Sequence, residues 1–269
     1  MSVERIPPAG ALSDIAVEIA TGTGQLIRTQ RHERFAVDTK STPTDMVTDV
    51  DRRAEAYIRD QLAKRRPEDA ILGEEGGGHA GRSGVRWLVD PIDGTVNFVL
   101  DLPQYAVSIA AEVDGQVVAA CVHNPVSGEV FRAALGSGAF VGDERLAGPR
   151  DISLDRAVVG TGFAYDGAVR ARQGTVVAQL LPRIADIRRA GSAALDLCAT
   201  AAGRLDAYFE VGLNPWDWSA GVLIASEAGC AVTGLRGRAP ASTMTAVAGA
   251  QVAADFFNLL EELGADRVT

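Results

Sequence analysis

The spacing of apolar residues predicts that the chain begins with helices. From residue 11 to about residue 30, apolar side chains recur every three or four positions, and the same pattern returns over residues 46–66. Pro67 follows the second segment, and proline does not continue a helix because it lacks a backbone N–H. We therefore expect two amphipathic helices that each turn one face toward a core.

Shorter apolar runs predict strands in the next part of the chain. Residues 70–73 form one such run and lead into a glycine-rich loop. Residues 87–89 form another, which we expect to end at Asp90 because Pro91 removes a hydrogen-bond donor from the sheet. Further strands are expected at residues 105–112, 116–123 and 129–134, the first two joined by an Asp-Gly turn that is typical of hairpins.

The pattern changes after a polar stretch at residues 142–150 that contains glycine and proline. Strand-like and helix-like segments alternate beyond it, with strands expected at 157–160, 184–188 and 206–211 and helices at 169–181, 193–202, about 216–228 and 251–263. A strand-rich part followed by alternation favours an α/β fold, or layered α+β fold, in which helices cover sheets. We predict one domain with an N-terminal lobe of about residues 1–148 and a C-terminal lobe of about residues 149–269.

Composition and charge narrow the classes of partner. The chain has 269 residues, of which 47% are hydrophobic, and its net charge is −9 from 26 Lys and Arg against 35 Asp and Glu. An acidic surface repels phosphate polymers, so we expect no nucleic-acid partner. No apolar run is long enough to span a membrane, and the first ten residues lack the features of a secretory leader. We therefore expect a cytoplasmic protein without a membrane partner.

The three cysteines do not indicate a metal or disulfide site. Cys121, Cys198 and Cys230 are far apart in the sequence, lie among small or apolar neighbours, and form no CxxC pair. We expect them to be buried thiols.

Acidic residues at the ends of strands and the starts of helices carry the clearest chemical signal. Asp90 and Asp93 flank a bend, and Gly94 and Thr95 then open a helical turn. Carboxylates beside free backbone N–H groups suit a divalent cation with a phosphate next to it, although Asp is also common as a turn or helix cap. Taken alone, this segment leaves both readings open.

Two more carboxylates, Glu74 and Asp217, occupy comparable positions. The helix dipole alone would explain an acidic residue at Asp217. No lysine lies next to any of the four carboxylates in the sequence, so no local partner charge is expected. If all four meet, oxygen ligands without His or Cys favour Mg²⁺ over zinc.

Six segments, in order along nearly the whole chain, resemble the inositol monophosphatase family. They are a Lys-x-x-Pro-x-Asp-x-Val-Thr-x-x-Asp run from Lys40 to Asp51, Gly-Glu-Glu at 73–75, Asp-Pro-Ile-Asp-Gly-Thr at 90–95, Gly-Ser-Ala-Ala-Leu-Asp at 191–196, Tyr-Phe-Glu at 208–210 and Trp-Asp-Trp-Ser-Ala-Gly at 216–221. The nearest subgroup is the bacterial inositol-1-monophosphatases of actinobacterial type. The resemblance implies an αβαβα five-layer sandwich of the inositol monophosphatase and fructose-1,6-bisphosphatase type, usually a homodimer, with lithium-sensitive, Mg²⁺-dependent phosphatase activity.

The resemblance also implies roles for individual residues. Glu74, Asp90 and the carbonyl of Ile92 would hold one Mg²⁺, while Asp90, Asp93 and Asp217 would hold a second. A third, weaker ion would lie near Glu74, reached by Asp51 through water and close to Lys40. Thr95 and Asp51 would orient the attacking water, and the N–H groups of Gly94 and Thr95 would hold the phosphate. Asp93, Ala193 and Glu210 would contact an inositol ring.

Substrate identity is open at this point. The expected reaction is hydrolysis of myo-inositol monophosphate, but related enzymes act on histidinol phosphate, fructose 1,6-bisphosphate or 3′-phosphoadenosine 5′-phosphate. Trp218 is bulkier than the small residue often found at its position and bears on this choice. A third reading, a protein-binding module that keeps the fold, predicts the loss of a metal carboxylate, and this chain has lost none.

Overall fold

The computed structural model describes residues 6–31, 33, 35–43 and 45–268. The α-helices of this part are α1 (Ala9–Gln30), α2 (Asp49–Arg65), α3 (Thr95–Val99), α4 (Gly167–Leu180), α5 (Ala193–Ala201), α6 (Pro215–Glu227) and α7 (Ala253–Glu262). Residues 1–5, on which the expectation about a leader partly rests, lie outside the described residues.

The strands form one large sheet, one small sheet and a two-stranded ribbon. The large sheet has the order β10-β9-β8-β7-β6-β5-β3-β4, and the small sheet has the order β12-β11-β13-β15-β14. Their bounds are β1 (Val37–Thr39), β2 (Met46–Thr48), β3 (Ala70–Gly73), β4 (Gly77–His79), β5 (Val85–Asp93), β6 (Ala106–Val113), β7 (Gln116–His123), β8 (Val130–Ala134), β9 (Gly138–Val141), β10 (Glu144–Arg145), β11 (Val158–Thr161), β12 (Asp186–Arg188), β13 (Ala207–Glu210), β14 (Ala231–Thr233) and β15 (Thr245–Ala248).

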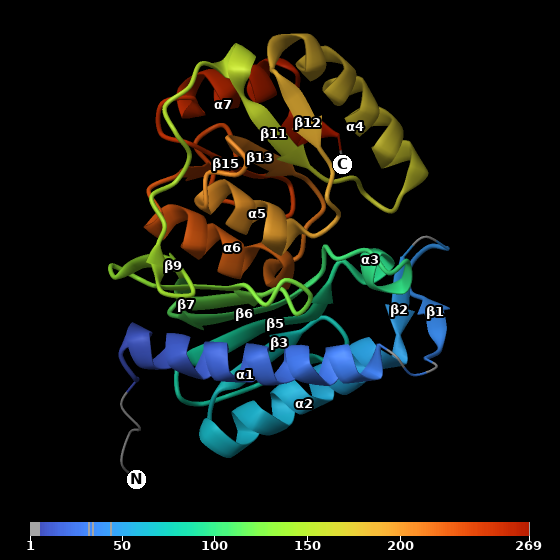
Figure 1. The fold of residues 1–269 in the computed structure, drawn as a ribbon, viewed down its shortest axis with the longest axis vertical. Helices are drawn as coiled ribbons and strands as arrows, with labels where there is room; N and C mark the ends of the chain where they lie inside the picture. Colours follow the sequence, from blue (N-terminus) through green and yellow to red (C-terminus); the bar gives the residue numbers. More distant parts are fainter. Residues whose placement is uncertain (1–5, 32, 34, 44, 269) are drawn as a thin grey trace.

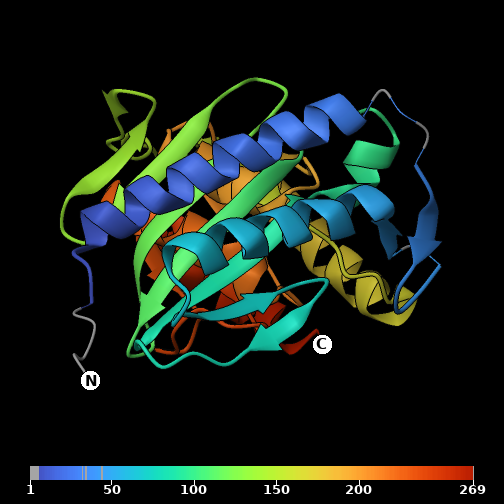
Figure 2. The ribbon, with the colours of Figure 1, turned by 90° about the horizontal axis from the view of Figure 1, so that it is seen from below.

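The elements stack in five layers, which confirms the predicted layered fold (Figure 1). Helices α1 and α2 cover the outer face of the large sheet, lying side by side across its strands (Figure 2). Helices α5 and α6 lie between the two sheets, and α4 and α7 cover the far face of the small sheet. Each helix layer follows from the apolar faces that the sequence pattern predicts.

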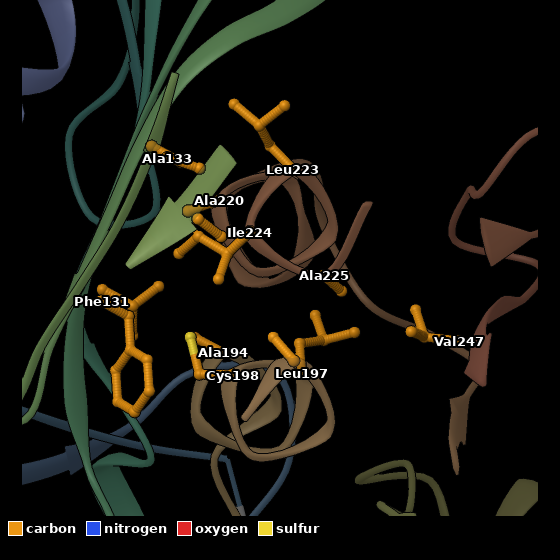
Figure 3. Packing of buried hydrophobic residues seen from close by; sticks show 14 of the residues in the cluster. Phe131, Ala133, Ala194, Leu197, Cys198, Ala220, Leu223, Ile224, Ala225 and Val247 are labelled. Carbon is orange, nitrogen blue, oxygen red and sulfur yellow. The ribbon is translucent and has the colours of Figure 1, made fainter. Parts of the chain in front are cut away.

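A continuous core joins the two sheets through helices α5 and α6. The residues labelled in Figure 3 are buried and come from β8, α5, α6 and β15: Phe131, Ala133, Ala194, Leu197, Cys198, Ala220, Leu223, Ile224, Ala225 and Val247. Gly221 allows the two helices to approach closely, because a Cβ there would lie 2.6 Å from the Cβ of Leu197. The two helices are thereby fixed against both sheets. The proposed division into two lobes stays a prediction.

The expected second helix starts later than its apolar pattern suggests. Residues 46–48 form β2, which pairs antiparallel with β1. Thr48 then caps α2: its Oγ1 accepts from the N–H of Asp51 at 3.3 Å, and the Asp51 carboxylate accepts from the N–H of Thr48 at 2.8 Å. This capping box sets the boundary, and the apolar residues before it belong to the ribbon.

The expectation that a strand ends at Asp90 was wrong. Strand β5 continues to Asp93 and passes through Pro91. Pairing with β3 stops at Val89, so the missing N–H of Pro91 interrupts nothing on that side. On the other side the register with β6 shifts between Asp90 and Asp93. Such a bulge accommodates a proline and re-aims the side chains next to it.

Two smaller expectations concern membranes and thiols. Among the described residues, no helix is long and apolar enough to cross a membrane. Cys121, Cys198 and Cys230 are buried and unpaired, which confirms that they are buried thiols.

Candidate active site

Most of the predicted site residues meet at one cavity of about 390 Å³ between the end of β5 and the helices of the middle layer. Its walls come from β5, α5, α6, the end of β13 and the segment at residues 162–165. The predicted residues that line it are Lys40, Glu74, Asp90, Ile92, Asp93, Gly94, Ala193, Glu210 and Asp217. Sequence positions as far apart as Lys40 and Asp217 therefore share one chamber.

The β5 bulge points Asp90 into the cavity. The N–H of Ile92 donates to Asp90 Oδ1 at 2.9 Å, which fixes the carboxylate relative to the bend. Asp90 is 2% exposed, and burial raises the pKa of its carboxyl well above the ordinary value. The charges of Glu74, Asp93 and Asp217 raise this pKa further, so all four acidic groups act on one another.

Asp93 ties the large sheet to the start of α5. Its Oδ2 accepts from Ser192 Oγ at 2.6 Å and from the N–H of Ala194 at 2.7 Å. Burial raises the pKa of Asp93 to about 6, although these hydrogen bonds oppose the shift. Asp93 therefore fixes the position of Ala193, the first residue of α5, in the cavity wall.

Asp217 serves both as a helix cap and as a cavity residue. It is the third residue of α6, and its Oδ2 accepts from the N–H of Asn214 at 2.7 Å in a capping box. Burial raises the pKa of Asp217 well above the ordinary value, and the negative charges of Asp93 and Glu74 raise it further. The two readings of this residue are therefore compatible.

Lys40 lies beside Glu74, as the family resemblance implies, although no lysine neighbours the carboxylates in the sequence. Its Nζ donates to Glu74 Oε1 at 2.7 Å and also bonds Glu75. Burial lowers the pKa of Lys40, but the charges and hydrogen bonds of the two glutamates outweigh it and leave the pKa raised. A lysine 34 positions away in sequence thus supplies positive charge at the outer edge of the site.

Asp51 and Thr95 form a buried pair next to the cavity. Thr95 Oγ1 lies 3.1 Å from Asp51 Oδ1 and 3.1 Å from the carbonyl oxygen of Ile92, so its one proton can serve either acceptor. Thr48 donates to the other Asp51 oxygen. Burial raises the pKa of Asp51, against the hydrogen bonds from Thr48.

Glu210 also lines the cavity, together with three residues that sequence reasoning missed. Tyr208 donates its hydroxyl to Glu210 Oε2 at 2.5 Å, and burial raises the pKa of Glu210 to about 7. Asp196, Arg189 and Tyr165 also line the cavity. Asp196 is 4% exposed, and burial followed by the charge of Glu210 raises its pKa to about 8.

The donor set suits a hard divalent cation. Carboxylates and a backbone carbonyl line the cavity, and no His or Cys is among its lining residues. Over residues 6–31, 33, 35–43 and 45–268, no three His, Cys, Asp or Glu side chains are placed as ligands of a single ion. Burial, together with the charges of neighbouring carboxylates, raises the pKa of Asp90, Asp93 and Asp217, and a bound cation would offset the repulsion among them.

Comparison with known proteins identifies the family. The profile of the inositol monophosphatase family matches residues 11–263. The chain belongs to the inositol monophosphatase family. The family assignment confirms the predicted phosphatase and the resemblance drawn from the motifs.

Individual members of the family agree with this assignment. An inositol-1-monophosphatase of Mycobacterium leprae is 49% identical over 239 residues, covering 81% of each chain. The protein called Nus factor SuhB in Escherichia coli K12 is 41% identical over 227 residues, covering 83% of this chain and 85% of its own. The crystal structure of the suppressor protein SuhB from Bartonella henselae superposes with a TM-score of 0.89 at 33% identity, covering 94% of this chain and 99% of that one. These matches confirm the sandwich fold.

Proposed function

We propose that this protein is a Mg²⁺-dependent phosphatase that hydrolyses myo-inositol monophosphate to myo-inositol and phosphate. The observation that carries the proposal is the convergence of Glu74, Asp90, Asp93 and Asp217 on one cavity that also contains Glu210. The cavity volume of about 390 Å³ lies in the range of small-molecule sites. A small phosphorylated polyol is the partner that this arrangement fits.

Two ions would share the carboxylates. Glu74, Asp90 and the carbonyl of Ile92 would hold one Mg²⁺, and Asp90, Asp93 and Asp217 would hold the second. A third, weaker ion would lie near Glu74, where Lys40 now donates its hydrogen bond. When bound, Mg²⁺ neutralises phosphate charge and makes a bound water more acidic.

The other residues orient the water and the phosphate. With its proton directed to Asp51, the Thr95 hydroxyl would accept a hydrogen bond from the attacking water. The carboxylate of Glu74 would accept a hydrogen bond from the other hydrogen of this water. The backbone N–H groups of Gly94 and Thr95 would hold phosphate oxygens in line with the attack.

The sugar end of the cavity would recognise hydroxyl groups. Glu210, held by Tyr208, would accept a hydrogen bond from one ring hydroxyl. Asp93 and the N–H of Ala193 would contact neighbouring hydroxyls. We extend the proposal to a cytoplasmic homodimer that is inhibited by Li⁺ and that needs neither nucleic acid nor a membrane.

Phosphate release from inositol 1-phosphate, measured with and without Mg²⁺, tests the proposal. We expect turnover that a chelator abolishes, that Asp93→Asn lowers by at least about 100-fold, and that Asp143→Asn leaves unchanged because Asp143 is exposed in a turn. The same assay on histidinol phosphate, fructose 1,6-bisphosphate and 3′-phosphoadenosine 5′-phosphate gives the ranking of substrates. No magnesium-dependent release from inositol 1-phosphate would refute the proposal, and faster turnover of another substrate would reassign the substrate class.

A further inference from the structure

A buried glutamate on α2 clamps the loop that carries Glu74. Glu55 is 2% exposed, and its carboxylate accepts from the N–H of Glu75 at 2.7 Å and from the N–H of Gly76 at 2.8 Å. Arg59, one helical turn further along α2, donates its Nε to Glu55 Oε1 at 2.7 Å and its Nη2 to the carbonyl of Gly77 at 2.5 Å. Two side chains of one helix therefore hold three consecutive residues of the loop.

Two glycines make room for this clamp. A Cβ on Gly73 would lie 2.5 Å from Glu55 Oε1, and a Cβ on Gly76 would lie 2.7 Å from the same oxygen. Neither glycine has a positive φ, so the close approach of the carboxylate, and not a left-handed turn, excludes a side chain at both positions.

The clamp fixes the peptide on the far side of Glu74. On the near side the N–H of Glu74 donates to the carbonyl of Val89 at 3.2 Å, which continues the β3–β5 pairing. Beyond Glu74 the chain no longer pairs with β5, and the Glu55 carboxylate accepts hydrogen bonds from the next two backbone N–H groups. Glu74 is thus anchored to the sheet on one side and to α2 on the other.

We propose that Glu55, supported by Arg59, is a positioning residue that sets the affinity of the site for its divalent cation by holding Glu74 in place. This inference rests on the proposed function, in which Glu74 ligates Mg²⁺. Neither Glu55 nor Arg59 lines the cavity, so the effect passes through the backbone of residues 74–77. A ligand that is held in place before the ion arrives loses less conformational freedom when it binds.

Removing the carboxylate would release the loop. The N–H groups of Glu75 and Gly76 would lose their acceptor, and the Arg59 guanidinium would lose its buried partner. Residues that support a metal ligand from behind typically change metal affinity by about 10–100-fold when substituted. We expect a loss of cation affinity within this range for Glu55→Ala.

Manganese binding to the purified full chain tests the inference without relying on turnover. Free Mn²⁺ is followed by electron paramagnetic resonance, and the Mg²⁺ concentration for half-maximal phosphate release is measured in parallel. Glu55→Ala should weaken Mn²⁺ binding by at least about 10-fold, while KM for inositol 1-phosphate at saturating Mg²⁺ changes by less than about twofold. Glu55→Gln, which keeps one acceptor oxygen, should restore part of the affinity.

Two further variants separate positioning from folding. Gly73→Ala displaces the Glu55 carboxylate without removing a charge and should weaken Mn²⁺ binding in the same direction. Glu262→Gln, an exposed glutamate on α7, is the matched control and should bind Mn²⁺ as the unmodified protein does.

The outcomes are distinguishable. If the Glu55 and Gly73 variants melt at lower temperature but bind Mn²⁺ with unchanged affinity when folded, the clamp is only structural and the inference is overturned. If the unmodified protein itself binds no Mn²⁺, the proposed function fails and the inference fails with it.

Discussion

Replacing Asp196 with asparagine should make the protein more stable, and increasingly so as the pH rises. Asp196 is 4% exposed, and no hydrogen bond to its carboxylate is formed within the described residues. Burial, followed by the charges of Glu210 and Asp93, raises its pKa from 3.8 to about 8. The folded protein therefore keeps a proton that the unfolded chain releases.

The sign and size of the effect follow from this difference in bound protons. Between the unfolded pKa and the folded pKa, the native state binds more protons, so the free energy of unfolding falls as the pH rises. A difference of one bound proton at this carboxyl changes the free energy of unfolding by at most about 1.4 kcal/mol per pH unit. Asparagine carries no charge and removes this contribution. For a chain of this size, each kcal/mol shifts the melting temperature by roughly 2–4 °C.

Thermal melts of the Asp196→Asn variant in the presence of a chelator measure the effect. We expect the stability advantage of the variant to grow by at least about 1 kcal/mol between about pH 5 and about pH 7. Asp143→Asn removes the same charge from an exposed turn and should show no such growth. An advantage of Asp196→Asn that is the same at both pH values would refute the reasoning, because it would mean that Asp196 is ionised in the folded protein throughout this range.

Three further predictions concern the substrate end, the core and the cation. Gly162→Ala should raise KM by about 10–100-fold, since its Cβ would lie 2.1 Å from both Glu210 carboxylate oxygens; Gly174→Ala, with open space around it, is the control. Asp69→Ala should cost about 3–5 kcal/mol in urea unfolding, because Asp69 accepts from Trp87 Nε1 at 2.8 Å and pairs with a buried arginine, and a loss below about 1 kcal/mol would contradict this. Adding Mg²⁺ after chelation should raise the melting temperature; no shift at millimolar Mg²⁺ would count against a carboxylate cation site.

Periodicity predicted most of the fold because most elements bury one face. The long helix α1 and the strands β3, β6, β7 and β8 begin and end within about two residues of the predicted bounds. Short edge elements were missed. Strand β4 consists of two glycines and a histidine, β9 ends just before the polar stretch at residues 142–150, and β10 lies within it. These strands are held in the sheet by pairing with neighbouring strands, and the local pattern of apolar residues does not predict this pairing.

Local residue preferences gave wrong predictions for two element boundaries that are set by pairing with distant strands. A proline such as Pro91 normally ends a strand. Here β5 pairs with β3 only as far as Val89, and its register with β6 shifts between Asp90 and Asp93, so the missing N–H of Pro91 is tolerated. The apolar residues Met46 and Val47 extended the predicted helix, yet their backbone pairs with β1. In both cases the deciding partner is distant in sequence.

Site residues could be predicted from the sequence where they belong to a recognisable motif, and most of the others could not. The acidic motifs led to Glu74, Asp90, Asp93 and Asp217, which the structure brings to one cavity. Asp196 had a usable signal, because it lies one helical turn after Ser192 and Ala193 and faces the same side of α5. Arg189 and Tyr165 reach the cavity from irregular segments, so no periodic pattern marks them.

Anomalous diffraction from crystals grown with Mn²⁺ tests the central claim most directly. The account predicts at least two anomalous peaks in the cavity, about 3.5–4 Å apart and bounded by Glu74, Asp90, Asp93 and Asp217. At saturating Mn²⁺, a cavity without an anomalous peak, or peaks held only by surface residues, would contradict it.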